Sequence, residues 1–511
     1  MNCPNRPSRR LFAALLLAIA SPTLAELPAT GPASQPTDLP KDWVVTHASI
    51  DLAAGPLAYT ATAGLLPLKN DAGKTQANIF FVAYAKDEKP NPARPITFVF
   101  NGGPGAASVW LHLGAAGPMR VKTDDFGHVG APPFTLEPNR DTWLDSTDLV
   151  FIDPVGTGYS RPAEGVKISE FTGTQNDLKS VAEFIRLFLT QNNQWGRPVY
   201  LAGESYGTTR AAALSALLAN DHGITVSGIA LISTVLNFAT LDFRPGNDLG
   251  YQLYMPSYAT VAWYQHKLSK EKQAMPVEQI AEGARQWMQD RYLPALAKGS
   301  TLPDADRQQI AKEYADWTGL PAETVLASNL RITGQQFEKI LLKDQRKIIG
   351  RFDARMTGYD LSPQQTSDPE FDPSLSEYLP AYTTAWNAYV RGTLGFKTDV
   401  KYEVLSPLVN PWDFGKGNLN VSDDMVHNLV EHPFTKILIC SSYYDLATPF
   451  AAIDQTMASF DLSPALRGQI GTEYFEAGHM LYHHAPDRKK LHDAIARLVT
   501  PAPTPTPTVA P

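Results

Sequence analysis

Cysteine is almost missing from this chain of 511 residues, which contains only Cys3 and Cys440. Cys3 falls in an N-terminal leader, which leaves Cys440 alone in the apolar run 437–440. A mature protein with one thiol cannot rely on an internal disulfide, and a single cysteine in a strand-like run is typically a small inert hydrophobe. This excludes a disulfide-built scaffold and gives Cys440 a structural role.

Positive charge and long apolar segments are also scarce. The net charge of −8 and the pI near 5.8 give no basic footprint for nucleic acid. After the leader, no uninterrupted apolar run approaches the roughly 20 residues of a membrane span. No H-E-x-x-H motif occurs, and we expect neither a metal nor a cofactor. The composition, 43% hydrophobic and 19% charged, is typical of a water-soluble globular protein.

The leader itself, residues 1–25, indicates a secretory signal peptide. It has a positively charged start, an apolar stretch at 11–20 and a small-residue cleavage site at 23–25. The charged residues are Arg6, Arg9 and Arg10. Their arrangement also fits a twin-arginine signal, so both export routes stay open. We expect an exported protein, periplasmic or secreted.

Five short apolar runs predict buried parallel strands, because each is continuous, rich in β-branched or aromatic residues, and ends in turn residues. They are 96–100, 149–152, 199–202, 229–232 and 437–440. Between the second and third runs, a capping box opening at Thr174 and apolar residues at helical spacing predict a helix. Strand, helix, strand predicts a mostly parallel central sheet flanked by helices.

The sequence pattern changes at about residue 241, where charged segments with helical periodicity replace the apolar runs that predict strands. We expect a core of residues 42–240 and 430–500, interrupted by a helical cap insertion at 241–429 that covers the site. The predicted cap helices include 277–296, 304–317 and 335–356. A separate domain unrelated to the site is the alternative for this segment. Residues 26–41 predict an extended lead-in, and the Pro/Thr tail 501–511 predicts disorder.

The sharpest chemical signal is Gly-Glu-Ser-Tyr-Gly at 203–207, directly after a predicted strand and before a predicted helix. Strand, G-x-S-x-G, helix is the context of a nucleophile elbow in the α/β-hydrolase fold, which makes Ser205 the candidate nucleophile. A serine hydroxyl needs a base, and the base needs an orienting acid.

The fold's chain order, serine then acid then histidine, points to Asp445 and His479. Asp445 follows the last apolar run, and His479 follows Gly478 after a strand-like Glu-Tyr-Phe, so both fall on the carboxyl edge of the sheet. The rivals are less well placed. They are His432, His483 and His484 for the base and Asp454 and Asp461 for the acid.

A glycine-rich loop, Asn-Gly-Gly-Pro-Gly at 101–105, follows the first strand run. Acyl transfer generates an oxyanion that preorganised N–H groups must meet. We assign these donors to the backbone of Gly103 and of Tyr206, the residue after the nucleophile. A phosphate-binding loop is excluded because no G-K-[ST] follows.

Five segments together resemble the serine carboxypeptidases, peptidase family S10, as a bacterial-type member. In family order they are 101–105, 153–160, 203–207, the Asp445 loop and 478–480. The resemblance implies an α/β-hydrolase that removes the C-terminal residue of peptides with a free C-terminus. Ser205 would form the acyl-enzyme, His479 would be general base and then acid, and Asp445 would orient it.

The same resemblance implies substrate-binding roles for Asn101, Gly102, Glu204 and Met480. In the family, the residues at Asn101 and Glu204 bind the terminal carboxylate. Two carboxylates repel unless they share a proton, so this arrangement predicts an acidic working pH. The chain departs from the family where Ala115 replaces a second glutamate, where Ala-Ala-Ser at 106–108 replaces Cys-Ser-Ser, and at Val99, which replaces a tryptophan.

These departures leave an esterase, an aminopeptidase or an acyltransferase with the same triad as alternatives. A non-catalytic binding protein on this scaffold would predict a broken triad, yet all three residues are present. The segment 350–355 (Gly-Arg-Phe-Asp-Ala-Arg) matches no chemistry, and we interpret it as a solvated ion pair at a helix end. The sequence leaves the oligomeric state open.

Overall fold

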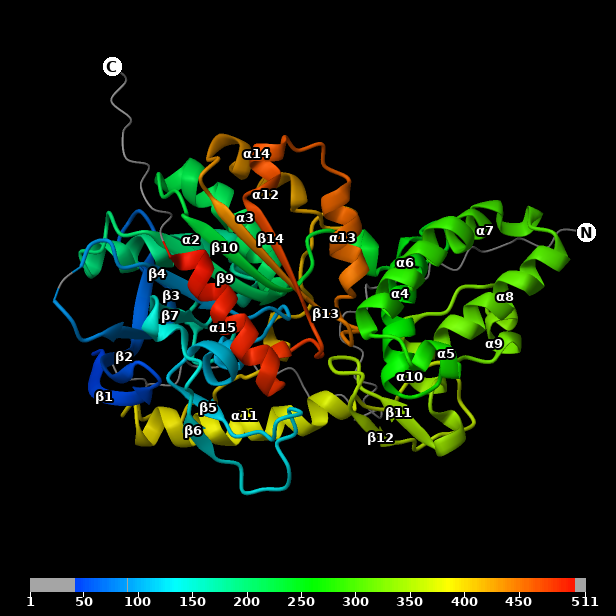
Figure 1. The fold of residues 1–511 in the computed structure, drawn as a ribbon. Helices are drawn as coiled ribbons and strands as arrows, with labels where there is room; N and C mark the ends of the chain where they lie inside the picture. Colours follow the sequence, from blue (N-terminus) through cyan, green and yellow to red (C-terminus); the bar gives the residue numbers. More distant parts are fainter. Residues whose placement is uncertain (1–41, 90, 501–511) are drawn as a thin grey trace, which may run out of the picture.

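A central sheet of ten strands organises the computed structural model, which describes residues 42–89 and 91–500 (Figure 1). The order is β1-β2-β3-β7-β4-β9-β10-β13-β14, with β8 paired to β3. The strands are β1 (Val44–Leu52), β2 (Gly55–Lys69), β3 (Thr75–Lys86), β4 (Ile96–Phe100), β7 (Asp148–Ile152), β8 (Arg161–Pro162), β9 (Val199–Ser205), β10 (Gly228–Thr234), β13 (Lys436–Ser442) and β14 (Ile470–Phe475). From β7 to β14 all neighbours pair in parallel.

The five predicted strands are confirmed as β4, β7, β9, β10 and β13. The structure adds three long antiparallel strands, β1 to β3, which lie at one edge of the sheet and which the sequence analysis did not predict. Two small antiparallel pairs lie outside the sheet. They are β5 (Met119–Val121) with β6 (Leu136–Pro138), and β11 (Lys347–Ile349) with β12 (Thr357–Tyr359).

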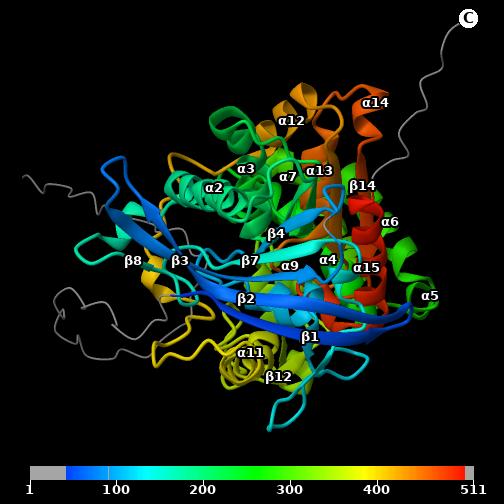
Figure 2. The same cartoon turned by 90° about the vertical axis from the view of Figure 1, so that its left-hand side faces the viewer.

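Helices cover both faces of the sheet (Figure 2). One face packs against α2 (Thr174–Gln191), α3 (Tyr206–His222) and α12 (Ser422–Glu431), and the other against α11 (Pro373–Gly392) and α15 (Ala485–Val499). In β4 the side chains alternate between these layers, since Phe98 and Phe100 join the first cluster and Val99 the second. The fold is therefore the mostly parallel sheet flanked by helices that the sequence predicts.

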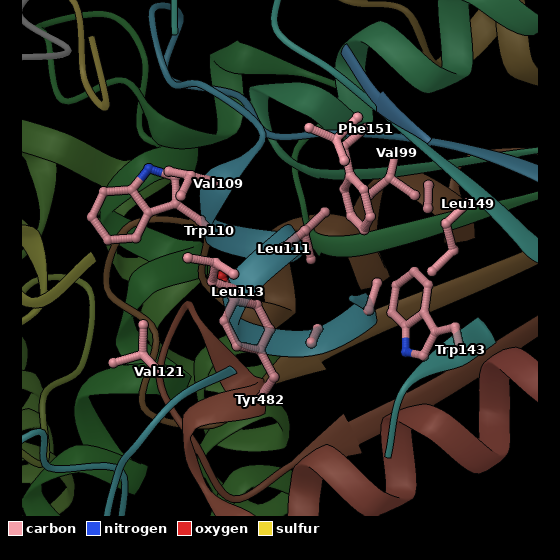
Figure 3. Packing of buried hydrophobic residues seen from close by; sticks show 14 of the residues in the cluster. Val99, Val109, Trp110, Leu111, Leu113, Val121, Trp143, Leu149, Phe151 and Tyr482 are labelled. Carbon is pink, nitrogen blue, oxygen red and sulfur yellow. The ribbon is translucent and has the colours of Figure 1, made fainter. Parts of the chain in front are cut away.

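The second cluster surrounds a short helical segment made of α1 (Val109–Leu111) and a π-helical turn, His112–Ala116. Figure 3 shows part of this cluster, with Tyr482 next to Leu113. The His112 ring stacks on Phe151 with their centroids 4.0 Å apart, and burial lowers the pKa of His112 to about 3. This histidine is a neutral core residue.

The chain between β10 and β13 is mostly helical and divides into two parts. The first has its own apolar core, to which Tyr443, Tyr444 and Leu446 of the Asp445 loop also belong. It contains α4 (Leu249–Tyr264), α5 (Lys270–Gln273), α6 (Val277–Trp287), α7 (Leu293–Lys298), α8 (Asp304–Thr318), α9 (Ala322–Ala327), α10 (Gly334–Ile340) and the β11–β12 pair. The second part, which begins with α11, packs on the sheet. The remaining helices are α13 (Phe450–Ala458) and α14 (Pro464–Arg467).

Two local predictions were wrong. The predicted helix 335–356 ends with α10 at Ile340. A 3-10 turn at Lys343–Gln345 follows, and Arg346, with a left-handed φ of 55°, leads into β11. Helix α2 begins without the predicted capping box: Gly173 is its N-cap, and Thr174 is its first helical residue. The Asp177 carboxylate that would complete the box binds Arg210 instead.

The predicted signal peptide 1–25, lead-in 26–41 and tail 501–511 lie outside the described residues. Within residues 42–89 and 91–500, none of the helices has both the length and the apolarity needed to cross a membrane. In that same part of the chain, no three His, Cys, Asp or Glu side chains group as a metal site.

Candidate active site

Ser205 is the last residue of β9, and α3 begins directly after it at Tyr206. Its backbone is strained, with φ of 60° and ψ of −131°, so the side chain stands at a sharp turn between strand and helix. The turn requires glycine on both sides. A Cβ at Gly203 would overlap the Gly207 carbonyl, and one at Gly207 would lie 2.9 Å from the Phe100 oxygen. This is the geometry of a nucleophile elbow.

Asp445 and His479 are joined by a buried hydrogen bond. His479 Nδ1 lies 2.8 Å from Asp445 Oδ2, and both side chains are almost fully buried. Asp445 Oδ1 accepts the backbone N–H groups of Ala447 and Thr448 at 2.7 and 3.0 Å. The Thr448 hydroxyl donates to Asp445 Oδ2 at 2.6 Å. These donors hold the carboxylate in one orientation toward the imidazole.

The loop of His479 meets the elbow through the neighbouring strand. Ser233, in β10 beside β9, donates its hydroxyl to the His479 carbonyl at 2.5 Å. In the described residues, no hydrogen bond joins Ser205 Oγ to the His479 ring. Ser205, Asp445 and His479 thus come from the carboxyl ends of β9, β13 and β14, at one edge of the sheet.

The segment 350–355, in the inserted region, contacts the loops of both Asp445 and His479. The His479 N–H donates to the Phe352 carbonyl at 2.5 Å, and the Leu446 N–H donates to the Arg351 carbonyl at 3.0 Å. A Cβ at Gly478 would overlap the Phe352 oxygen, which explains the glycine before the histidine.

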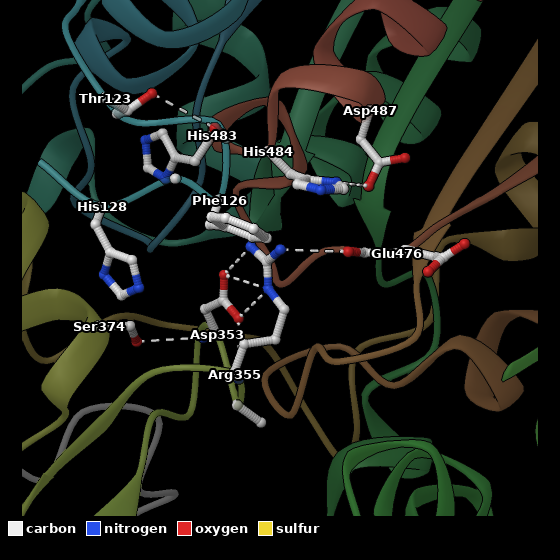
Figure 4. A network of polar contacts seen from close by, with 12 residues as sticks. Thr123, Phe126, His128, Asp353, Arg355, Ser374, Glu476, His483, His484 and Asp487 are labelled. Carbon is white, nitrogen blue, oxygen red and sulfur yellow. Dashed lines mark hydrogen bonds and ion pairs between the residues drawn. The ribbon is translucent and has the colours of Figure 1, made fainter. Parts of the chain in front are cut away.

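The ion pair of this segment is buried, contrary to the solvated pair expected from the sequence. Arg355 and Asp353 side chains are only 5% and 3% exposed. Arg355 donates to both oxygens of Asp353, and its Nη1 donates to the Glu476 carbonyl at 3.3 Å (Figure 4). The pair therefore ties the inserted region to the loop that precedes His479.

The glycine-rich loop 101–105 lies against the elbow. A Cβ at Gly102 would overlap the Tyr206 nitrogen, so only glycine permits this approach. The Gly103 N–H has no hydrogen-bond partner among the described residues, and an N–H in the first turn of a helix, as at Tyr206, has no partner within that helix. The two N–H groups therefore stay the candidate oxyanion donors that the sequence predicts.

Glu204, next to the elbow serine, is 4% exposed and lies beside Asn101. The Asn101 amide donates to Glu204 Oε1 at 3.0 Å, and its own oxygen accepts the Leu111 N–H at 3.0 Å. Burial raises the pKa of Glu204 to about 7, against the opposing effects of His479, Tyr482 and Asn101. This carboxyl is therefore protonated at acidic pH and holds a charge only near or above neutrality.

Two effects oppose one another at His479. Burial alone would lower the pKa of the imidazole, but the charge and hydrogen bond of Asp445 outweigh it, and the pKa is raised. The negative form of Glu204 adds to this increase. The protonation states of Glu204 and His479 are therefore coupled.

A family model described as serine carboxypeptidase matches residues 53–472 of this chain. The chain belongs to the serine carboxypeptidase family. One relative is serine carboxypeptidase-like 36 of Arabidopsis thaliana, 27% identical over 201 residues, or 38% of each chain. Another is pheromone-processing carboxypeptidase KEX1 of Lachancea thermotolerans, 33% identical over 159 residues, which cover 29% of this chain and 19% of that protein.

These alignments thus span well under half the length of either relative. Among solved structures, the peroxisomal alpha-beta-hydrolase Lpx1 of Saccharomyces cerevisiae is 10% identical, with a TM-score of 0.32, and the match covers 93% of this chain and 94% of that one. The family membership and the sheet topology of this chain establish the α/β-hydrolase fold. The prediction of a bacterial-type member stays a prediction.

The other candidate residues of this serine carboxypeptidase family member are also placed. Met480 is buried directly after His479, and Ala115 lies fully buried in the π-helical turn His112–Ala116, where it supplies no carboxyl. The rival histidines have structural partners: His483 Nε2 contacts Tyr382 Oη at 2.7 Å, and His484 Nδ1 contacts Asp487 at 2.8 Å. Burial raises the pKa of the Cys440 thiol, which fits an inert core residue.

Sequence reasoning missed several residues that support the site. Thr448, Ser233 and Phe352 reach the catalytic loops from different parts of the chain. Only Thr448 left a sequence signal, a hydroxyl three residues after the candidate acid.

Arg210 supports the loop of Asn101 from behind. It is 1% exposed, forms a two-pronged ion pair with Asp177, and donates to the Asn101 carbonyl at 2.6 Å. An Arg210→Met variant leaves the Asp177 carboxylate buried without its cation, and we expect it to lose about 3–5 kcal/mol of unfolding free energy. Urea unfolding measures this loss as a lower midpoint.

The matched control for this prediction is Arg186→Met. Arg186 pairs with Glu183 at the surface, with side chains 37% and 28% exposed, so its loss is expected to cost less than about 1 kcal/mol. Equal midpoints for the two variants would contradict the importance of the buried pair.

Proposed function

We propose that this protein is an exported serine carboxypeptidase that hydrolyses the C-terminal residue of peptides through an acyl-enzyme on Ser205. The observation that carries the proposal is the buried Glu204 carboxyl, paired with Asn101, directly beside the elbow serine. An α/β-hydrolase needs no such group for ester cleavage, whereas a carboxypeptidase must hold a terminal carboxylate next to its nucleophile.

The reaction begins when Ser205 Oγ attacks the last peptide carbonyl and its proton passes to His479 Nε2. Asp445 orients the imidazole, since it accepts from Nδ1. The carbonyl oxygen becomes an oxyanion, which accepts hydrogen bonds from the N–H groups of Gly103 and Tyr206. When the C–N bond breaks, His479 gives its proton to the leaving amine, and an acyl-enzyme remains. Water then attacks the acyl-enzyme carbonyl and gives its proton to His479, and His479 returns this proton to Ser205 Oγ as the ester bond breaks and the shortened peptide leaves.

Glu204 and Asn101 bind the terminal carboxylate of the substrate, with Gly102 and Met480 beside them. Glu204 must be protonated to accept this partner, because two negative charges in a buried site repel. The pKa of Glu204 is about 7, so binding is intact below that pH and is lost as the pH rises through it. This sign favours substrate binding at acidic pH.

The fall in activity at low pH has a different cause, the protonation of His479. His479 must be neutral to take the serine proton, and its raised pKa keeps it charged at low pH. The rate constant for acylation therefore falls on the acidic side while substrate affinity falls on the alkaline side. The two limbs define a narrow optimum for free-acid peptides.

The first experiment compares one blocked dipeptide as free acid and as C-terminal amide, from pH 4 to 8. We expect cleavage of the free acid, strongest between the two limbs on the acidic side of neutrality and weaker at both pH 4 and pH 8, and little cleavage of the amide. Equal cleavage of both would overturn the carboxypeptidase assignment. Hydrolysis of a simple ester with neither peptide cut would favour the esterase or acyltransferase, and a requirement for a free N-terminus would favour the aminopeptidase.

A Glu204→Gln variant tests the carboxyl directly. Glutamine is neutral at every pH, so we expect its KM for the free acid to stay within about twofold between pH 5 and 8, while the wild-type KM rises about tenfold per pH unit above neutrality. Steady-state kinetics at each pH measure both. Glu476→Gln, exposed on the same loop as His479, is the control and should keep the wild-type profile. An unchanged alkaline limb in Glu204→Gln would assign that limb to another group.

The proposal that the protein is exported rests on the leader 1–25, which fits either a general secretory or a twin-arginine signal. Processing at residues 23–25 would place the mature start near Glu26.

A further inference from the structure

Two buried oxygens beside the elbow have unused hydrogen-bonding capacity. Glu204 Oε2 has no partner in the structure, although Oε1 of the same carboxyl accepts from Asn101. Tyr482 is 0% exposed, and its hydroxyl likewise forms no hydrogen bond of ordinary geometry within residues 42–89 and 91–500. An unpaired buried polar atom costs free energy, so each calls for an explanation.

The two orphaned groups are neighbours. The Tyr482 hydroxyl contacts the Glu204 carboxyl and opposes the effect of burial on the pKa of Glu204, but this contact falls outside the length and angle of an ordinary hydrogen bond. The hydroxyl proton and the second carboxyl oxygen therefore remain available to a third group.

The fold fixes Tyr482 in this place. It lies three residues after His479, in the short turn Leu481–His483. Its ring packs on Gly114, where a Cβ would overlap it, and Gly114 is the residue before Ala115. Figure 3 shows the ring next to Leu113 of the same turn. The phenol thus covers the turn that has no carboxyl at Ala115.

A nearby tyrosine, by contrast, has a hydroxyl with a clear hydrogen-bond partner. Tyr382 also approaches Gly114, but its hydroxyl contacts His483 Nε2 at 2.7 Å. Tyr482 has the same surroundings without such a partner. Packing alone accounts for its ring, and the hydroxyl is left unexplained.

We propose that the Tyr482 hydroxyl is a further donor to the terminal carboxylate of the substrate, beside protonated Glu204 and Asn101. The inference rests on the proposed carboxypeptidase function. A carboxylate has two oxygens, and it can accept from Tyr482, from the Glu204 carboxyl proton and from the Asn101 amide. Tyr482 supplies a donor that keeps its proton throughout the working range, which a second glutamate would not do.

The test is Tyr482→Phe, which removes the hydroxyl and keeps the ring. A hydrogen bond to a charged group predicts a rise of about 10- to 100-fold in KM for the free-acid dipeptide, with kcat within about threefold of wild type. Hydrolysis of a simple ester without a carboxylate should change by less than about twofold. An unchanged KM for the free acid overturns the proposal.

Tyr378→Phe is the matched control, because Tyr378 is buried in α11 and its hydroxyl also has no partner. We expect its KM to equal that of wild type, and an equal rise in both variants would overturn the specific role of Tyr482. A second measurement compares the Kd of the free-acid dipeptide in Ser205→Ala with and without Tyr482→Phe, where turnover does not interfere. Equal Kd values would also overturn it.

These outcomes stay separate from those of the proposed function. The wild-type preference for free acid over amide tests the carboxypeptidase, and the Tyr482 variant tests only how that preference is achieved. A wild type that shows the preference, together with a Tyr482→Phe variant that keeps it unchanged, supports the first and rejects the second.

Discussion

A Ser205→Ala variant is expected to lose about 10⁶-fold in kcat towards a free-acid dipeptide. The strained elbow aims this side chain at the edge where Asp445 and His479 meet, and alanine offers no atom that can form the acyl-enzyme. In other serine hydrolases the loss of the nucleophile costs about 2 × 10⁶ in kcat, and binding and oxyanion stabilisation account for the residual rate. Single-turnover kinetics with purified protein measure the change.

The control is Ser215→Ala, in the helix that begins at the elbow. Ser215 is fully buried, and its hydroxyl donates only to the Ala212 carbonyl within that helix, so its loss should leave kcat within about twofold. A phosphonylating reagent should add mass to wild type and to Ser215→Ala but not to Ser205→Ala. Wild-type activity in Ser205→Ala would place the nucleophile elsewhere.

The parallel part of the fold could be predicted because its strands are buried on both faces. A strand such as β4, with all five residues buried, is a continuous apolar run in the sequence. The antiparallel strands escaped prediction for the opposite reason. In β2, buried and more exposed residues alternate along much of the strand, so no continuous run marks it. This strand is stabilised by its pairing with β1 and β3, which its composition alone does not predict.

At the site, residues within a short motif could be predicted and those that act across the chain could not. The elbow, the acid and the histidine each follow a strand, which local pattern reveals. The Phe352 carbonyl reaches His479 from a residue more than a hundred positions earlier, and Ser233 is still farther away in sequence. Such contacts depend on tertiary packing, for which no spacing rule exists. The prediction for segment 350–355 was wrong for this reason: charged residues of both signs beside a glycine suggest a solvated pair, whereas the fold buries the Asp353–Arg355 pair.

Asp445→Asn is expected to lower kcat about 10⁴-fold while leaving the fold intact. The reason lies in how the two oxygens of Asp445 are used. Oδ1 accepts two backbone N–H groups, from Ala447 and Thr448, and an asparagine can satisfy them only with its amide oxygen. The amide nitrogen then takes the place of Oδ2 and points at His479 Nδ1.

An amide nitrogen at that position donates a proton where the carboxylate accepted one. His479 Nδ1 must then become the acceptor, which moves its own proton to Nε2, and a protonated Nε2 cannot take the proton of Ser205. The Thr448 hydroxyl can rotate to accept from the new amide, so the exchange costs function more than stability. Steady-state kinetics and urea unfolding, run together, separate the two effects.

Asp454→Asn provides the comparison for an aspartate outside the catalytic machinery. Asp454 lies in α13, where it binds Arg285 and Tyr474 at 2.7 and 2.6 Å. Its substitution should reduce stability while kcat stays within about threefold of wild type. If Asp454→Asn lost activity to the same extent as Asp445→Asn, the loss would reflect general disturbance of the loops. A large effect confined to Asp445 would instead reflect the imidazole tautomer that its carboxylate selects.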